Sequence, residues 1–143
     1  MKMQTTARVL VVDDEDRFRQ TIRRLLEKAG HTVDEAPDGT TALGMLESGD
    51  FDVVLLDLKM PGLSGEDTFL KIRQLGIDAE VVCLTGHVSV ADATKLLQKG
   101  AFDYLLKPAS VSEILQCVSR AAESKMLRNE KIEVSQLLGY GDD

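Results

Sequence analysis

The sequence predicts an α/β protein built on a doubly wound sheet of five parallel strands. Five short apolar runs recur along the 143 residues, and a helical pattern of apolar residues lies between each run and the next. Such alternation is typical of βα units, which place successive strands in parallel. Two of the runs are apolar at every position, as strands covered by helices on both faces require. We expect the strands at residues 8–12, 32–36, 52–56, 80–84 and 102–105.

The strand runs differ in polarity. Residues 9–12 read VLVV and residues 53–56 read VVLL, so both strands belong in the middle of the sheet. Residues 31–36 read HTVDEA, which is more polar and suits an edge of the sheet.

The intervals between the strands carry helix signals. An apolar face built around Phe18, Ile22 and Leu26 predicts the first helix, which Gly30 ends. Serine residues that are followed three positions later by an acid predict the starts of three further helices. These pairs are Ser64 with Asp67, Ser89 with Asp92, and Ser110 with Glu113, and Gly76 and Gly100 follow the first two of these helices.

The last helix has no evident stop signal. Its predicted buried face comprises Val111, Ile114, Leu115, Val118, Ala121 and Ala122. A helix-prone segment of mixed charge continues to about Leu138. We therefore divide the chain into a domain at residues 1–124 and a helical extension or linker at residues 125–143.

Composition and charge narrow the class of protein. The 24 acidic residues exceed the 17 basic ones, which gives a net charge of −7. This balance argues against a general nucleic-acid binder and against docking on anionic lipid. No apolar run approaches the length of a membrane span, and residues 1–8 lack the apolar core of a signal peptide, so we expect a cytoplasmic protein. Cys83 and Cys117 lie in apolar patterns and are expected to be reduced core residues.

Polar residues follow four of the five predicted strands. They are Asp13 and Asp14, Asp57, Thr85 and Lys107. Because ligands of a doubly wound sheet bind beyond the carboxyl ends of its strands, these side chains are expected to converge on one rim. Each has a plainer interpretation when taken alone, such as a helix cap, a turn or a solvated lysine. Their combination on one rim, and not any one of them alone, indicates a ligand-binding or catalytic site.

The expected cluster suits phosphoryl transfer. Neighbouring carboxylates raise one another's pKa unless a cation lies among them, and Mg²⁺ prefers oxygen ligands. An aspartate beside Mg²⁺ can act as a nucleophile toward phosphorus. A lysine and a hydroxyl would then hold the transferred group, because this chemistry needs mainly positioning and charge neutralisation.

The stretches VLVVDDEDRFR, DVVLLDLKMPGLSG, VVCLTGH and GAFDYLLKPAS resemble the receiver domain of bacterial two-component response regulators. The resemblance covers residues 6–124 with the motifs in the family's order. The wording LTGH and GAFDYLLKP is closest to receivers of the nitrogen-regulator type, which usually precede an ATPase domain of enhancer-binding activators. The resemblance implies a flavodoxin-like sheet with strand order 2-1-3-4-5.

The resemblance also implies roles for the acidic residues. Asp57 would accept a phosphoryl group from the phosphohistidine of a sensor histidine kinase. Asp14 would bind Mg²⁺ directly, Asp13 partly through water, and the backbone carbonyl of Lys59 would be another ligand.

The remaining roles concern holding, switching and lifetime. Lys107, preceding a cis bond to Pro108, would pair with the phosphoryl oxygens. Thr85 would hydrogen-bond the phosphoryl group, and Tyr104 would rotate inward behind it. Lys59 and His87 occupy the positions with which the family tunes the phosphoryl lifetime.

The resemblance implies a signalling switch that catalyses only its own phosphorylation and dephosphorylation. Its output would be a change of the surface formed by the fourth helix, the fifth strand and the fifth helix. We expect this surface to form a homodimer, helped by apolar residues of the extension. These are Met126, Leu127, Ile132, Val134, Leu137 and Leu138. The extension is too short for a helix-turn-helix, so we expect no direct nucleic-acid binding by this chain.

Two alternatives from other classes stay open. A phosphatase of the dehalogenase superfamily also uses an Asp nucleophile and Mg²⁺, but that family needs a second Asp two residues after the nucleophile, where this chain has Lys59. A flavodoxin-like flavin carrier needs a hydroxyl-rich loop after the first strand, where this chain has the acids at 13–15.

Overall fold

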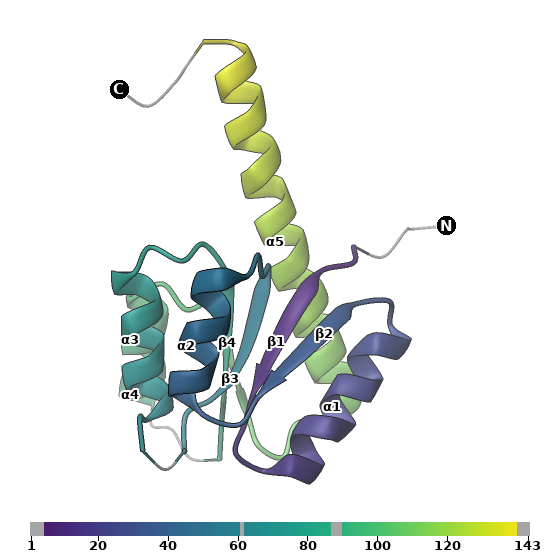
Figure 1. Ribbon diagram of the computed structural model, residues 1–143, viewed down its shortest axis with the longest axis vertical. Coiled ribbons are helices and arrows are strands. Elements are labelled where there is room, and N and C mark those ends of the chain that lie inside the picture. The colour runs from purple at the N-terminus through teal and green to yellow at the C-terminus, as the bar shows by residue number, and fades with distance from the viewer. Residues whose placement is uncertain (1–4, 61, 87–89, 140–143) are drawn as a thin grey trace.

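The computed structural model describes residues 5–60, 62–86 and 90–139 (Figure 1). Its five strands form one parallel sheet in the order β2-β1-β3-β4-β5, so the predicted fold class and strand order are confirmed. The strands are β1 Arg8–Val12, β2 Thr32–Ala36, β3 Val53–Asp57, β4 Glu80–Thr85 and β5 Asp103–Leu106. The helices are α1 Asp16–Lys28, α2 Gly39–Ser48, α3 Gly65–Gln74, α4 Val90–Gln98 and α5 Val111–Leu137.

Three strands end later than the apolar runs predicted. β3 extends through Asp57 and β4 through Thr85, while β5 is displaced by one residue. The reason is that the ladder between strands uses backbone groups, so a polar side chain does not end it. Asp57 is thus still aligned with Leu84 in the register of β3 and β4.

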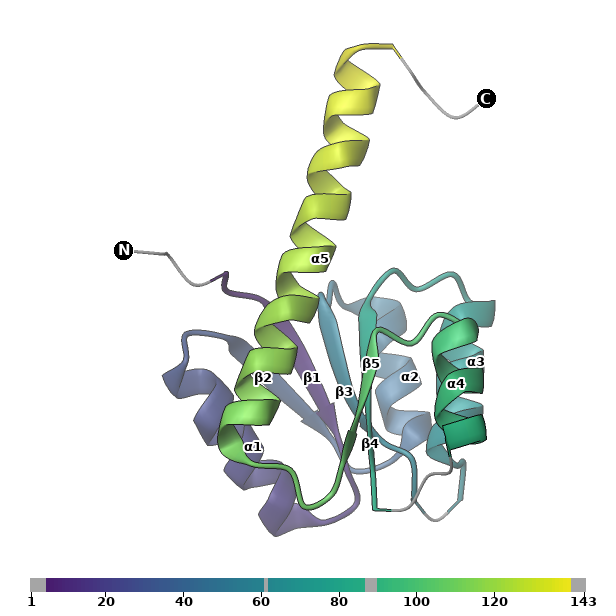
Figure 2. The ribbon, with the colours of Figure 1, turned by 180° about the vertical axis from the view of Figure 1, so that it is seen from behind.

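Helices cover both faces of the sheet (Figures 1 and 2). One apolar cluster lies under α1 and α5 and includes Ile22, Leu26 and Val118. The other lies under α2, α3 and α4 and is centred on Phe69 and Ile72. The central strands β1, β3 and β4 are buried on both sides, which explains the apolar runs of β1 and β3, whereas the edge strands β2 and β5 are partly exposed. Cys83 and Cys117 are both buried, free thiols of this core.

The predicted helix caps are present where the structure describes them. The Ser64 hydroxyl accepts a hydrogen bond from the backbone N–H of Asp67. Ser110 and Glu113 form a complete capping box at the start of α5. The predicted cap at Ser89 lies outside the described residues.

α5 is much longer than the other helices and projects beyond the amino edge of the sheet (Figures 1 and 2). It runs unbroken through residue 124, and its last buried residues are Ala121 and Ala122. The prediction that Val111 is buried was wrong: this residue is 47% exposed, because it is the first of α5 and core packing on this helix begins only at Ile114. None of the helices in the described ranges combines the length and the hydropathy of a transmembrane span.

Candidate functional site

Three aspartates meet at the carboxyl edge of the central strands. Asp13 and Asp14 follow β1, and Asp57 is the last residue of β3. One carboxylate oxygen from each of the three lies within 4.8 Å of those from the other two. Asp13 and Asp57 are buried, whereas Asp14 is exposed. The structure therefore brings together the acids that were expected on one rim.

Lys107 extends over this cluster from the loop after β5. Its Nζ lies 2.9 Å from Asp13 Oδ2 and 3.7 Å from Asp57 Oδ2. The ammonium also lies 4.3 Å from the centre of the Phe18 ring, which shields it on the α1 side. The backbone N–H of Lys107 donates to the carbonyl of Thr85, and the peptide bond to Pro108 is cis.

Burial dominates the electrostatics of Asp57. It raises the pKa of this carboxyl to about 6, and the charges of Asp13 and Asp14 act in the same direction. The hydrogen bond from the backbone N–H of Lys59 and the charge of Lys107 oppose the rise. The ionised form of Asp57 is therefore costly in the protein alone, and an added cation would favour it.

The pKa of Lys107 is also raised, but for a lysine this rise favours the charged form. Burial acts to lower it, but the hydrogen bond to Asp13 and the charges of Asp13, Asp57 and Glu15 outweigh burial and raise it. The ammonium consequently stays charged across the neutral range and can attract an anionic group to the rim.

The other predicted site residues lie around the cluster. Thr85 is buried at the carboxyl end of β4, next to β3 in the sheet. Tyr104 is half-buried on β5 and packs against the cluster under α2, α3 and α4. The Lys59 side chain is exposed beside Asp57, whereas His87 lies outside the described residues.

Arg19 is a residue of the site that the sequence interpretation missed. It is buried on α1, and its guanidinium donates to the Asp13 carbonyl at 2.8 Å and to Glu35 at 2.9 Å. These bonds hold the backbone that presents the first acids. Its position on the buried face of α1, one turn before Ile22, was the available signal.

Gly65 is a second such residue. A Cβ at this position would overlap the backbone carbonyl of Asp57 and the Cα of Leu58. The first turn of α3 thus packs directly on the end of β3 that carries the candidate nucleophile. Only glycine permits this close approach, and nothing in the local sequence pattern distinguishes it from an ordinary helix start.

Residues 9–119 match the family model described as the response regulator receiver domain. This match spans most of the chain, and the parallel sheet with its acidic rim is as the family requires. The chain belongs to the receiver-domain family of response regulators, whose members act in phosphorylation-dependent signalling. This membership favours a signalling switch over the phosphatase and the flavin carrier.

Curated relatives support the assignment. The nitrate/nitrite response regulator NarP of Escherichia coli is 35% identical over 130 residues, which cover 90% of this chain and 60% of NarP. The C4-dicarboxylate transport regulator DctD of Rhizobium meliloti is 33% identical over 125 residues, which cover 87% of this chain and 27% of DctD. The chain thus spans about half or less of the length of most curated relatives it matches.

Solved structures share the fold. NtrX from Brucella abortus superimposes with a TM-score of 0.81 at 30% identity, over 92% of this chain and 30% of NtrX. A receiver domain protein from Clostridium thermocellum superimposes with a TM-score of 0.75 at 36% identity, over 87% of this chain and 97% of that protein.

Proposed function

We propose that this receiver accepts a phosphoryl group from the phosphohistidine of a sensor histidine kinase on Asp57. The observation that carries the proposal is the buried Asp57 carboxylate, flanked by Asp13 and Asp14 and faced by Lys107. In the transfer, an Asp57 oxygen forms a bond to phosphorus while the P–N bond breaks, and the imidazole nitrogen leaves with the electron pair. The aspartyl phosphate is later hydrolysed by water, which restores the Asp57 carboxylate and releases inorganic phosphate, so the chain acts as a switch that catalyses only its own phosphorylation and dephosphorylation.

Mg²⁺ is the metal that this set of ligands fits. Asp13, Asp14 and Asp57 offer oxygens close enough to share one small divalent ion, and the backbone carbonyl of Lys59 is a further candidate ligand. When bound, the ion would neutralise the clustered carboxylates and the charge of the phosphoryl group. The raised pKa of Asp57 supports a cation here, because burial and neighbouring acids disfavour its ionised form otherwise.

The phosphoryl group would change the surface of the domain through its effects on Lys107, Thr85 and Tyr104. Lys107 would move part of its pairing from Asp13 to the phosphoryl oxygens, and the Thr85 hydroxyl would hydrogen-bond the same group. Tyr104 would turn toward the space behind Thr85 and change the surface of α4, β5 and α5. Such a switch requires that the phosphoryl group stabilise the active conformation more than the inactive one.

The same proposal extends to lifetime and partners. Lys59, with its exposed side chain beside Asp57, and His87 would tune the rate of hydrolysis. The partners would be the kinase and a second copy of the chain bound through α4, β5 and α5, with no direct nucleic-acid contact by this chain. The free thiols of the core suit the reducing cytoplasm, where we place the protein.

Phosphorylation of the Asp57→Asn variant tests the assignment. Wild-type protein incubated with labelled acetyl phosphate, or with a phosphorylated kinase, should acquire label only when Mg²⁺ is present. Asp57→Asn keeps the shape of the side chain but loses the nucleophile, so it should acquire none. Asp50→Asn, an exposed acid away from the rim, is the matched control and should label normally.

Label on Asp57→Asn at the wild-type rate would refute the assignment of the phosphoacceptor. Equal labelling with and without a chelator would refute the requirement for Mg²⁺. In the same assay, removal of the donor from labelled Lys59→Ala should give a half-life several-fold different from that of the wild type.

A further inference from the structure

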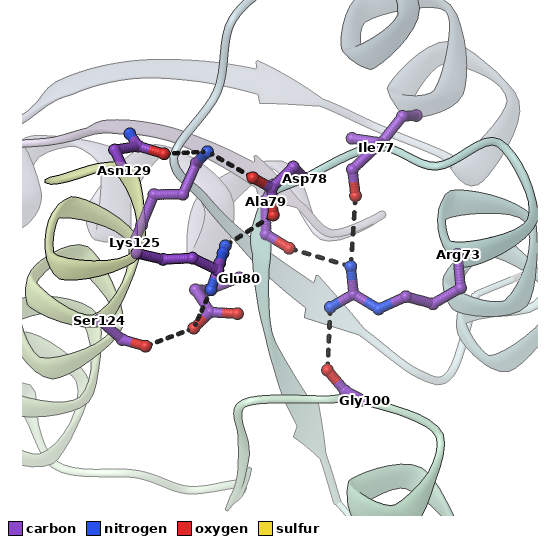
Figure 3. Close-up of polar contacts among 10 residues, drawn as sticks. Arg73, Ile77, Asp78, Ala79, Glu80, Gly100, Ser124, Lys125 and Asn129 are labelled. Carbon is purple, nitrogen blue, oxygen red and sulfur yellow. Dashed lines mark hydrogen bonds and ion pairs between the residues drawn. The ribbon is translucent and has the colours of Figure 1, made fainter. Parts of the chain in front are cut away.

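A second cluster of charged residues lies at the amino edge of the sheet, since it includes Glu80, the first residue of β4, whereas the acidic site lies at the carboxyl ends of the strands. Figure 3 shows the polar contacts around it. The Arg128 guanidinium of α5 lies 2.7 Å from Asp78 Oδ1 and 3.1 Å from Glu80 Oε2. The Ser124 hydroxyl donates to Glu80 at 2.6 Å, and Lys125 Nζ lies 3.0 Å from Asp78 Oδ2. We call these five residues the latch.

The latch is placed where apolar packing of α5 ends. Ala122 is the last buried residue of α5, and beyond it the described side chains are half-buried or exposed. Arg128 lies four residues after Ser124 and three after Lys125, so it neighbours both side chains on the surface of the helix. Charged contacts, in place of apolar ones, therefore hold α5 against the domain at the point where it leaves the sheet.

The two acids of the latch are themselves firmly held. Glu80 is the first residue of β4 and is buried. Asp78 lies in the loop before β4, and Arg73 of α3 fixes that loop from the other side (Figure 3). Arg73 donates to the carbonyls of Ile77 and Ala79, and also to that of Gly100 before β5. The acids are consequently a fixed support, and α5 is the part that can move.

The latch is incompletely satisfied. The Nε–H of Arg128 is buried and has no acceptor among the residues that the structure describes. A buried donor without a partner reduces the stability of the closed arrangement. Asp78 is half exposed, so water and salt ions can compete for its part of the contact. These features suit a contact that opens without unfolding the domain.

We propose that the latch sets the direction of the α5 arm, residues 125–137, and that opening it lets this unbroken helix tilt about its last buried residues, Ala121 and Ala122. The arm is about 20 Å long, so a small change of angle at the latch moves its far end by a large distance. No latch residue belongs to the acidic site. Opening the latch therefore leaves phosphoryl chemistry unchanged, and this inference does not depend on the proposed function.

The distance between a spin label on the domain and one on the arm shows where the arm lies relative to the domain, and the width of the distance distribution shows how much it moves. Glu47→Cys on α2 and Gln136→Cys on the arm provide exposed labelling sites. Burial raises the pKa of Cys83 to about 12 and that of Cys117 to about 11, so the native thiols resist labelling. Dilution with unlabelled protein removes distances between copies. The otherwise unchanged chain should give a single narrow distance distribution.

Arg128→Gln should broaden this distribution at least twofold, because both bridges to the acids are lost. Lys131→Gln is the matched control, since it removes the same charge one turn further along the arm, outside the latch. It should leave the distribution narrow. Arg128→Lys keeps the charge but cannot bridge two carboxylates in the same way, and it should give an intermediate width.

Amide hydrogen exchange of residues 125–137 shows whether Arg128→Gln unwinds the arm. If it does, the Asp78→Asn variant decides the test. This loop variant leaves α5 untouched and should also broaden the distribution. The proposal is overturned if the distance distribution of Asp78→Asn is as narrow as that of the Lys131→Gln control. The same outcome for Arg128→Gln overturns it if the arm of that variant is still helical. Beryllofluoride, a mimic of the phosphoryl group, should bind equally to all variants. Its loss in a latch variant would contradict the claim that the latch acts independently of the acidic site.

Discussion

Single residues decide how the acidic rim is presented. Arg19 holds the backbone of Asp13 from α1, while the absence of a side chain at Gly65 lets α3 pack on the backbone of Asp57. Neither residue has any chemistry to perform. Their effect is on position, and the rate of a transfer reaction falls steeply when its groups are misplaced by even 1 Å.

Gly65→Ala should therefore impair phosphorylation while the chain still folds. The added methyl group would force the end of β3 or the start of α3 to shift, because the atoms that it meets are backbone. We expect the rate of labelling with acetyl phosphate to fall roughly 10- to 100-fold. Gly44→Ala, on α2 with open space at the Cβ position, should label as the wild type does. Equal rates for both variants would contradict this positioning role.

His31 should make stability depend on pH near neutrality. It is buried, its Nδ1 accepts a hydrogen bond from the backbone N–H of Ala7, and burial lowers its pKa below 6.5. The folded state favours the neutral ring, so its contribution is present above pH 6.5 and is lost as the pH falls below that value. His31→Asn can keep the acceptor but does not titrate. Denaturant unfolding at pH 7.5 and 5.5 should show a larger loss for the wild type than for the variant, and equal losses would exclude His31 as the cause.

Elements are positioned by their ends. The amino end of α5 begins with the capping box of Ser110 and Glu113, which starts two residues after Pro108 and three after Lys107 in the sequence. The cap therefore fixes the start of α5 and, with it, the loop that carries the lysine of the rim. At its other end the same helix is held by the latch, so α5 links the two edges of the sheet.

Ser110→Ala should reduce the free energy of unfolding by about 1 kcal/mol, because it removes the acceptor for the backbone N–H of Glu113. Urea denaturation measures the change. Ser112→Ala, two residues further along and exposed, is the control and should have little effect. A similar loss in both variants would show that the cap contributes nothing specific.

At the scale of the whole molecule, apolar side chains remain on the surface. Leu97, Leu106 and Val111 are exposed on α4, β5 and α5, and the arm adds a further group. On the arm these are Met126, Leu127, Ile132, Val134, Leu137 and Leu138. Exposed apolar groups on adjacent elements commonly mark an interaction surface. This arrangement supports the proposed homodimer.

Sedimentation of the full chain with and without beryllofluoride should show a monomer–dimer equilibrium that the phosphoryl mimic strengthens. Leu106→Glu places a charge in the proposed interface and should weaken the dimer at least tenfold. Leu75→Glu is the control, because Leu75 and Leu106 are both 53% exposed but Leu75 lies at the end of α3. Monomers under every condition would refute the homodimer.

Much of the fold follows from patterns within about ten residues of the chain. Apolar runs, helix faces and the Ser64 and Ser110 caps depend on the local backbone and its nearest side chains, so they were predictable. The rim was predictable too, because parallel strands bring their carboxyl ends to one edge. The strand order came from the resemblance to receivers, since local patterns do not say which strands are neighbours.

Contacts between residues far apart in the sequence could not be predicted from the sequence, because helix packing on the sheet creates them. Arg19 meets Glu35, Gly65 meets the backbone of Asp57, and Arg128 meets Glu80 across 48 positions of chain. A charged residue looks the same in sequence whether it faces water or a distant partner. Which of the two it does depends on how helices pack on the sheet, and only the tertiary structure supplies that information.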